Sequence, residues 1–265
     1  MRAISTFKRV STDISEIQQR ITTGQRINSG KDDPGGLIIR EGLRADIKTI
    51  HATQANMTQA ENLMDVASGG MMQLLELLRG ADTNNPSDGG LLGILNGSLG
   101  FAEMQDEAEN LMSLYDSVVA STKYNNVDLL KGTTRTFQLG GGESLAVIIG
   151  NLDTGALVAD LRTAVTAIAD DTTVAAAITA AETLQTKIAE ELGKLGGSQK
   201  IVAMNQRLLD SRLTNVTAAE GRISNADIAV ESSRMARAEL LAQNAMSSIM
   251  YTRNYAAFAV SSLFR

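Results

Sequence analysis

Residues 4–24 read ISTFKRVSTDISEIQQRITTG, and the apolar side chains in this stretch recur every three or four residues. That spacing places them on one narrow stripe of a helix, which Gly24 is expected to end. Coiled coils use such a stripe to pack one helix against another. The stripe consists of Ile4, Phe7, Val10, Ile14, Ile17 and Ile21. The N-terminal end therefore predicts a helix that needs a partner helix.

The other end of the chain offers that partner. Residues 223–265 contain neither Gly nor Pro, and a pause at residues 224–227 separates a terminal helix from the helix before it. The repeated alanines of this terminal helix allow a second helix to approach closely. Two such helices alone bury little surface, and isolated helices of this length are marginal in water. We therefore expect the two ends to pair, and to become ordered only when neighbouring molecules enclose them.

The composition favours long helices over a rounded globule. Aromatic residues make up 3% of the chain, Trp is absent and only two Pro occur, whereas 43% of the residues are hydrophobic. Few prolines suit uninterrupted helices. An apolar seam, supported by a second stripe, predicts a helix over residues 37–78, about 60 Å long at 1.5 Å per residue. The predicted fold is mainly α, an elongated rod of long helices in coiled-coil packing with one small β-hairpin.

The central part of the chain predicts that hairpin and a further helix. Clustered Gly, Asn and Asp indicate a loop or a helix–helix corner over residues 80–100, and residues 101–123 predict a helix. Residues 124–130 predict a turn that enters extended structure. Apolar residues then alternate on either side of a Gly-Gly-Gly turn, which predicts the hairpin at about residues 134–150.

Two groups of glycines lie within the regions that are predicted to form long helices. Gly193, Gly196 and Gly197 are expected to interrupt a helical region over residues 155–192, so that the last long helix before the terminal one begins near Ser198. Gly69 and Gly70 lie inside the helix predicted over 37–78, where each costs about 1 kcal/mol relative to Ala. They either mark a close helix contact or are merely tolerated.

Residues that support catalysis or metal binding are scarce. The chain has no Cys, which excludes disulfides and thiolate ligands, and His51 is the only histidine. A metal or catalytic site needs several converging groups, so we interpret His51 as an ordinary helical residue. Asp32 and Asp33 could bind a divalent cation, but adjacent carboxylates before Pro34 are more often a cap and salt-bridge cluster. We expect no enzyme activity, no cofactor and no metal site.

Charge and hydropathy argue against two further functions. The basic excess at the two ends is small and mixed with acidic residues, so no nucleic-acid binding is expected. No run of 18 apolar residues occurs, so no membrane insertion is expected. Because the N-terminal end lacks a charged leader and a cleavage site, any export is expected to follow a route without a cleaved signal peptide.

Four segments, in order along the chain, resemble bacterial flagellin. Jointly they are specific, and the likeness covers about residues 1–153 and 195–265. The first segment is TGQRINSGKDDPGGL at residues 23–37, which is similar to the family's SSGLRINSAKDDAAGL. The second is YNNVDLL at 124–130 with FQLG at 137–140, which is similar to the family's FNG segment and hairpin. The last two are GRISNADIA at 221–229, similar to SRIxDADYA, and VSSLFR at 260–265, similar to the family's Leu/Ser-rich end.

The resemblance implies a structural subunit of the bacterial flagellar filament, a motility tube that self-assembles from many identical copies. Residues 1–36 with 224–265 would form the inner coiled-coil layer. Residues 37–223 would form a surrounding rod layer, with no separate outer domain. The resemblance also implies a secreted, extracellular location, an export chaperone, the type III export apparatus, and hook-associated proteins at the filament ends.

The predicted assembly residues combine the N-terminal stripe with polar residues of these motifs. A polar turn between two helical layers must satisfy its charges on neighbours, so Arg26, Asp32 and Asp33 are predicted to bridge subunits. The full set consists of Ile4, Phe7, Val10, Ile14, Ile17, Ile21, Arg26, Asn28, Asp32, Asp33, Arg222, Asp227 and Leu263.

Two alternatives stay open at this point. The start MRAIST and the DDP at residues 32–34 also resemble the hook–filament junction protein, a relative of flagellin, although the motif at residues 221–229 favours the filament subunit. A helical-bundle enzyme or regulator is a remote alternative. It would need a convergent polar site, and the sequence contains none.

Overall fold

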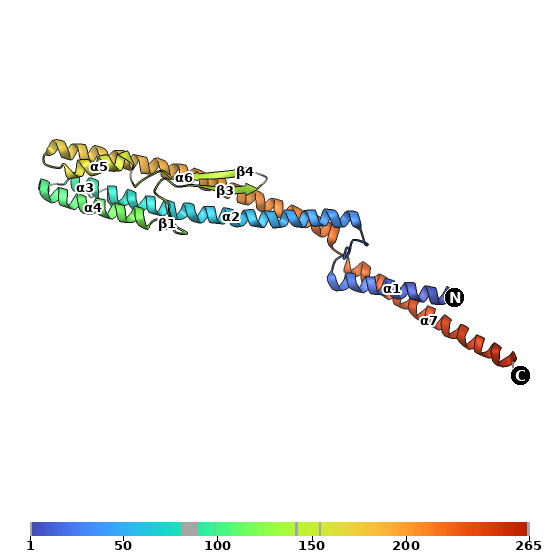
Figure 1. Cartoon of the computed structure of the whole chain (residues 1–265). Helices are drawn as coiled ribbons and strands as arrows, with labels where there is room; N and C mark the ends of the chain where they lie inside the picture. Colours follow the sequence, from blue (N-terminus) through green and yellow to red (C-terminus); the bar gives the residue numbers. More distant parts are fainter. Residues whose placement is uncertain (1, 81–89, 98, 141–142, 154, 264–265) are drawn as a thin grey trace. The chain divides into compact units, whose positions relative to one another are not determined.

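The computed structural model describes residues 2–80, 90–97, 99–140, 143–153 and 155–263, and it is mainly α-helical as predicted (Figure 1). Within these residues no helix is both long and apolar enough to cross a bilayer. The elements in chain order are α1 (Arg2–Thr23), α2 (Pro34–Arg79), α3 (Leu91–Leu95), α4 (Phe101–Ser121), β1 (Lys123–Tyr124), β2 (Val127–Asp128), β3 (Thr134–Gly140), β4 (Glu143–Ile148), α5 (Ala156–Thr166), α6 (Asp171–Ser224) and α7 (Ile228–Leu263).

The first of two compact units contains both ends of the chain, Met1–Lys48 and Arg212–Arg265. Its main feature is the predicted pairing of the terminal helices, and α1 and α7 lie side by side (Figure 1). Helix α1 ends as expected, because Gly24 adopts a φ of +67°, which other residues rarely reach.

The second unit, Thr49–Ser211, holds the larger core. Methionines and small aliphatic residues line the inner faces of its helices, including Met57, Met64, Met71 and Met112. Tyr115 is a rare buried aromatic, and its hydroxyl donates a 2.8 Å hydrogen bond to the carbonyl of Leu152. A buried phenol needs such an acceptor, so this bond ties α4 to the segment that follows the β3–β4 hairpin.

Two antiparallel hairpins follow α4. Between β1 and β2, Asn125 and Asn126 have φ of 48° and 62°, the conformation of a tight two-residue turn that Asn tolerates. The predicted hairpin is confirmed as β3 paired with β4, in a register that sets Phe137 opposite Leu145. The turn residues Gly141 and Gly142 lie outside the described residues.

Helix α2 buries the predicted stripe but starts earlier than predicted. It begins at Pro34 rather than Leu37, because Asp33 caps it and Pro is favoured in the first helical turn. Apolar members of the predicted seam are buried at a strict seven-residue spacing, and the second stripe at Ala60, Leu63 and Ala67 is buried beside them. The buried seam residues in this series are Ile50, Met57, Met64, Met71 and Leu78. Glu61, a polar position of the seam, is exposed.

Helix α6 corrects the expectation that glycines would interrupt the chain. It runs for 54 residues through Gly193, Gly196 and Gly197, and it begins at Asp171 rather than near Ser198. Its buried face continues past the glycines through residues such as Ile188, Leu195 and Val202. Each of these buried side chains contributes about 1.5–3 kcal/mol, which outweighs the weak helix propensity of Gly.

The true break lies earlier, between α5 and α6. Asp170 accepts a 2.8 Å hydrogen bond from the backbone N–H of Thr173, and the hydroxyl of Thr173 accepts one from the N–H of Asp170. This reciprocal cap starts α6 and separates it from α5, which the sequence reading had joined into one helical region.

The two central glycines of α2 turn out to differ. A Cβ on Gly69 would meet no atom within 4 Å, whereas one on Gly70 would lie 2.5 Å from the Thr122 hydroxyl oxygen. Gly70 therefore marks a close contact with the residue that follows α4, and Gly69 is tolerated.

Replacing Gly196 by Ala is expected to raise the free energy of unfolding of the monomer by about 1 kcal/mol, because Ala favours the helix and the new methyl meets no atom within 4 Å. Gly70→Ala is the matched control on α2 and is expected to lower stability, because Thr122 is itself buried. Urea unfolding followed by circular dichroism measures both. A gain in both variants, or a loss in both, would contradict this account.

Candidate functional site

The predicted N-terminal stripe is the surface through which α1 meets α7. Val10 and Ile17 are buried, and together with Ala238 of α7 they form a small apolar cluster. Ile14, Ile21, Met235 and Ala242 pack around this cluster, and Phe7 is half-buried. Ile4, at the start of α1, stays 61% exposed. The pair therefore uses most of the stripe, and the small side chains of α7 let the two helices approach closely.

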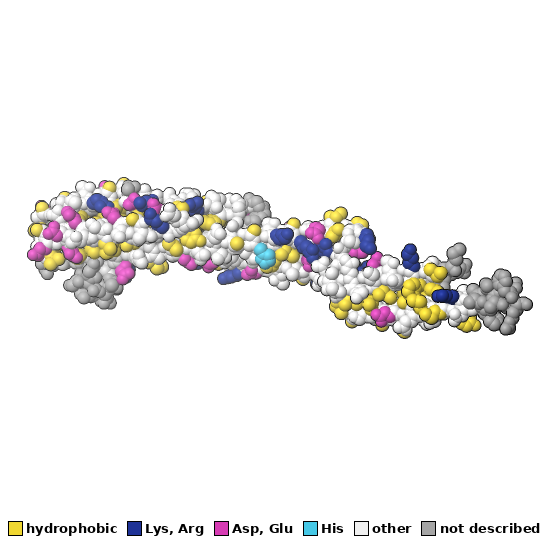
Figure 2. Space-filling view, turned by 60° about the horizontal axis from the view of Figure 1, so that its bottom comes forward, with side chains coloured by type: hydrophobic (Ala, Val, Ile, Leu, Met, Phe, Trp, Pro, Cys, Tyr) yellow, Lys and Arg dark blue, Asp and Glu magenta, His cyan; other side chains and the backbone are white. Residues whose placement is uncertain are grey.

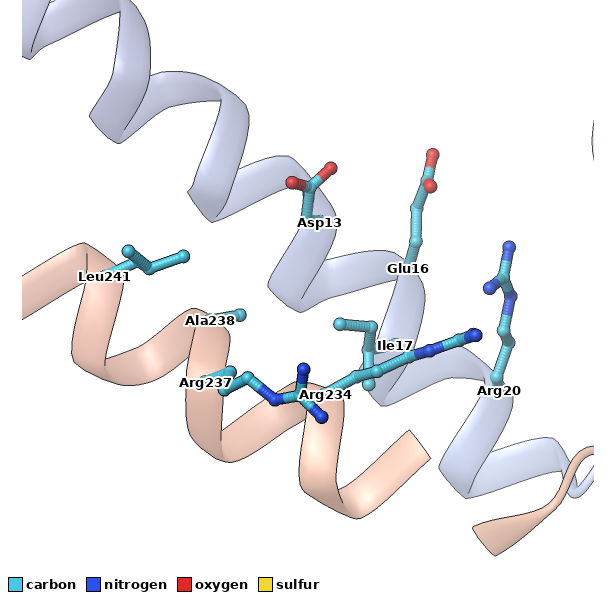
Figure 3. A pocket seen from close by; sticks show the side chains of 8 residues that line it. All are labelled: Asp13, Glu16, Ile17, Arg20, Arg234, Arg237, Ala238 and Leu241. Carbon is cyan, nitrogen blue, oxygen red and sulfur yellow. The ribbon is translucent and has the colours of Figure 1, made fainter. Parts of the chain in front are cut away.

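An open groove runs along one side of this helix pair (Figure 3). Ile17, Ala238 and Leu241 supply its apolar lining. The charged lining residues are Asp13, Glu16 and Arg20 from α1 and Arg234 and Arg237 from α7. With both signs of charge present and no enclosed cavity, the groove has the character of a contact surface rather than a small-molecule site.

A buried carboxylate, Glu231, lies beside two of the arginines that line this groove. The side chain of Glu231 is 6% exposed, and one of its oxygens lies 2.8 Å from Arg234 and 3.9 Å from Arg20. A buried charge is tolerated when a cation partners it. Glu231 therefore connects the start of α7 to the end of α1.

Backbone hydrogen bonds join the turn after α1 to the turn before α7. The N–H of Arg26 donates to the carbonyl of Ser224 at 2.6 Å, and the N–H of Ala226 donates to the carbonyl of Gly24 at 2.9 Å. The Arg26 guanidinium adds hydrogen bonds of 3.1 and 3.3 Å to the carbonyl of Ile223. These bonds satisfy the end of α6 and fix the two turns against each other.

Asp32 and Asp33 serve the turn itself, in agreement with the cap and salt-bridge reading. Asp32 accepts hydrogen bonds from the N–H groups of Asn28 and Ser29 at 3.0 and 2.8 Å. The N–H of Ser29 is the largest influence on the pKa of Asp32, which lies below its ordinary value of 3.8. Because the folded pKa is the lower one, this carboxylate stabilises the turn above pH 3.8 and loses that effect as the pH falls through its native pKa.

Asp33 caps α2 and touches Arg26. Its carboxylate accepts the N–H of Gly36 at 2.9 Å, and it lies 3.9 Å from the Arg26 guanidinium. A Cβ on Gly36 would collide with the Asp33 carboxylate and lie 2.8 Å from Ile27. Glycine at position 36 is therefore what lets the buried Ile27 and the cap share this space.

Two arginines near this turn were not predicted from the sequence: Arg40, which contacts the turn itself, and Arg44, which contacts α6. Arg40 is 7% exposed and donates to the carbonyl of Ile27 and to Glu41. Arg44 donates to Glu220 of α6 at 3.0 Å. No local pattern marks either residue, because their partners, above all Glu220 for Arg44, are reached only in the folded chain.

The remaining predicted residues occupy less connected positions. The side-chain amide of Asn28 donates to the carbonyl of Gln25 at 3.0 Å. Asp227 caps α7 by accepting the N–H groups of Ala229 and Val230 at 3.0 and 3.2 Å, and Arg222 is exposed. The side chain of Leu263 lies outside the described part of the chain. Arg26, Asp32 and Asp33 all have partners within the chain, and their bridging of subunits stays a prediction.

The paired helices leave much apolar surface uncovered. Figure 2 shows hydrophobic side chains gathered on the exposed surface of this pair. The most exposed large hydrophobic residues of the first unit are Ile4, Ile38, Ile39, Leu240, Leu241, Met250 and Tyr251. Contiguous exposed apolar surface marks an interaction site. The arrangement therefore suits protein–protein contact. Among the described residues no group of His, Asp and Glu could hold a metal ion.

Comparisons with known proteins point the same way. The family model for the bacterial flagellin N-terminal helical region matches residues 1–135, and the model for the flagellin C-terminal helical region matches residues 178–254. The chain is 27% identical to a flagellin of Halalkalibacterium halodurans, over 93% of this chain and 90% of the relative. It is 26% identical to a flagellin of Bacillus subtilis, over 91% and 90% of the two chains.

A solved structure shares the fold. A Vibrio parahaemolyticus protein described as flagellar hook-associated superposes with a TM-score of 0.60, over 73% of this chain and all of that chain. At 15% sequence identity this likeness concerns the fold alone.

Asp33→Ala is expected to lower the free energy of unfolding of the monomer by about 1 kcal/mol, because it removes the cap of α2. Asp33→Ser is the matched control, since its hydroxyl can still accept the N–H of Gly36 while the charge beside Arg26 is lost. Thermal unfolding of the monomer compares the two. If both variants unfold at the temperature of the parent, while both polymerise poorly, Asp33 acts on neighbouring subunits rather than as a cap.

Proposed function

This chain belongs to the bacterial flagellin family, and we propose that it is a structural subunit of the flagellar filament. The observation that carries the proposal is the α1–α7 pair, which brings the two ends of the chain together yet leaves large hydrophobic residues exposed on both helices. A surface of this kind needs partners, and identical neighbours that present the same surface can supply them.

The proposed layers follow from this pairing. Residues 1–36 with 224–265 would line the inner tube, and residues 37–223 would form the layer around it. Support comes from the difference in core size, because the terminal pair buries one small cluster whereas Thr49–Ser211 holds a core of many fully buried side chains. The terminal pair is therefore the part of the chain that contacts with neighbouring copies would stabilise most.

The proposal includes an extracellular location and a route to it. Type III export of an unfolded chain, assisted by a chaperone, would deliver subunits to the growing filament, where hook-associated proteins would bound its ends. The absence of Cys supports this route, because an unfolded chain without thiols cannot form cross-links during transport.

The purified chain is expected to form long filaments when monomer is added to short filament fragments, because each added copy presents the same surface to the next. Electron microscopy of the products measures their length against time and monomer concentration. Continuous elongation supports a filament subunit. Caps of a fixed short length would instead assign the chain to the hook–filament junction, and the absence of any polymer would overturn the proposal.

Brief proteolysis of the monomer is expected to remove both ends and leave a fragment of about residues 40–225. The terminal pair has one small cluster to offset the entropy of ordering two helices. Filaments should resist the same protease at the same sites, and mass spectrometry identifies the cut positions. Equal protection of the ends in monomer and filament would show that they fold within the single subunit.

A further inference from the structure

One face of α6 carries a continuous ridge that nothing in the described chain covers. Gly193, Gly197, Ile201, Met204 and Leu208 follow one another at steps of four, four, three and four residues, which places them on one side of the helix. Ile201 is 41% exposed, Met204 62% and Leu208 65%. We call these five residues the α6 ridge.

The glycines of the ridge have no explanation within the monomer. Each costs about 1 kcal/mol relative to Ala in a helix, and a Cβ on Gly193 or Gly197 would meet no atom within 4 Å. By contrast, Gly36 and Gly70 are each needed for a close contact inside the chain. A helix surface without side chains lets another backbone approach closely, so the two ridge glycines suit a helix that comes from outside.

Charge indicates what that helix should look like. Residues 192–209 of α6 carry Lys194, Lys200 and Arg207 and no acidic side chain. Lys200 and Arg207 are exposed, and within the described residues no ion pair involves either of them. At about 100° per residue, Lys200 and Arg207 both lie along one side of the ridge. The ridge therefore fits a helix that offers an exposed apolar side chain and carboxylates beside it.

The chain presents such a helix on its own surface. Helix α4 has five acidic residues and no basic ones. Its outer face, opposite the buried Met104, Ala108 and Met112, carries Glu103, Asp106 and Glu107 beside Leu114, which is 50% exposed. Within the described chain these three carboxylates make no ion pair. We call these four residues the α4 acidic face.

We propose that the α6 ridge of one copy packs against the α4 acidic face of a second copy. Two different surfaces meet in such a contact, so each copy keeps one of each surface free, and the contact can repeat without end. The inference rests on the proposed filament function and adds to it a specific contact between copies. The ridge glycines allow close approach, Leu114 meets the apolar side chains, and Lys200 and Arg207 pair with the carboxylates.

Charge reversal on both surfaces tests the contact. Lys200→Glu with Arg207→Glu gives a ridge-reversed chain, and Glu103→Lys with Glu107→Lys gives a face-reversed chain. Each alone brings like charges together and should raise the critical concentration for polymerisation at least about tenfold. An equimolar mixture should polymerise near the critical concentration of the parent, because each variant then meets its opposite charge.

The control carries the same change in charge elsewhere. Arg79→Glu with Arg135→Glu replaces two exposed cations that lie off the ridge, and this chain should polymerise alone as the parent does. Circular dichroism of each monomer checks that it is folded. If either reversed chain polymerises alone like the parent, or if the mixture stays monomeric while the parent forms filaments, the contact is wrong and the filament function stands.

The glycines provide a second, independent measurement. Gly197→Ala is expected to raise the unfolding temperature of the monomer and at the same time to raise the critical concentration. Gly196→Ala, about 100° away around the same helix, should stabilise the monomer equally and leave polymerisation unchanged. Equal polymerisation of the two variants would overturn the close approach at Gly197.

Discussion

The structure depends on a helix pair that is too thin to bury its own apolar surface. Val10 and Ile17 meet Ala238 along one line, so each helix covers one stripe and leaves the rest to solvent. Burying a large aliphatic side chain contributes about 1.5–3 kcal/mol, whereas ordering each backbone residue costs about 1–2 kcal/mol. Two long helices that share one small cluster are therefore marginal by themselves. We expect the rest of their stability to come from surfaces that neighbouring copies supply.

The turns that join this pair to the rest of the chain do not depend on neighbouring copies, because their polar groups form hydrogen bonds and ion pairs within the chain. Arg26 bonds the end of α6, Asp33 caps α2, and Arg40 holds the carbonyl of Ile27. A connector that satisfies its own charges keeps its geometry before any neighbour arrives. It fixes where α1 ends and where α7 begins.

Local patterns in the sequence were enough to predict the N-terminal stripe and the β3–β4 hairpin. The helix shows a period of three to four residues and the strands a period of two, and both periods are visible within a short stretch of sequence. They were not enough for α6, because the helix propensity of Gly193 is a local quantity whereas the burial of Leu195 depends on distant segments. The same limit applies to the candidate site. The cap at Asp33 was readable from its neighbours, but the role of Arg44 depends on Glu220, which is 176 residues away in sequence.

Features that one copy leaves unsatisfied are the ones that carry information about assembly. A glycine at position 70 is explained by Thr122 in the same chain, so it needs no partner. Gly197 costs the monomer helix stability and gains no contact there, and Leu208 exposes most of its side chain on the same face. A sequence that keeps such residues gives up stability in the free subunit. In the proposed α6–α4 contact, that loss is offset where a second copy approaches the ridge, so the residues that weaken the free helix are the ones that would strengthen the polymer.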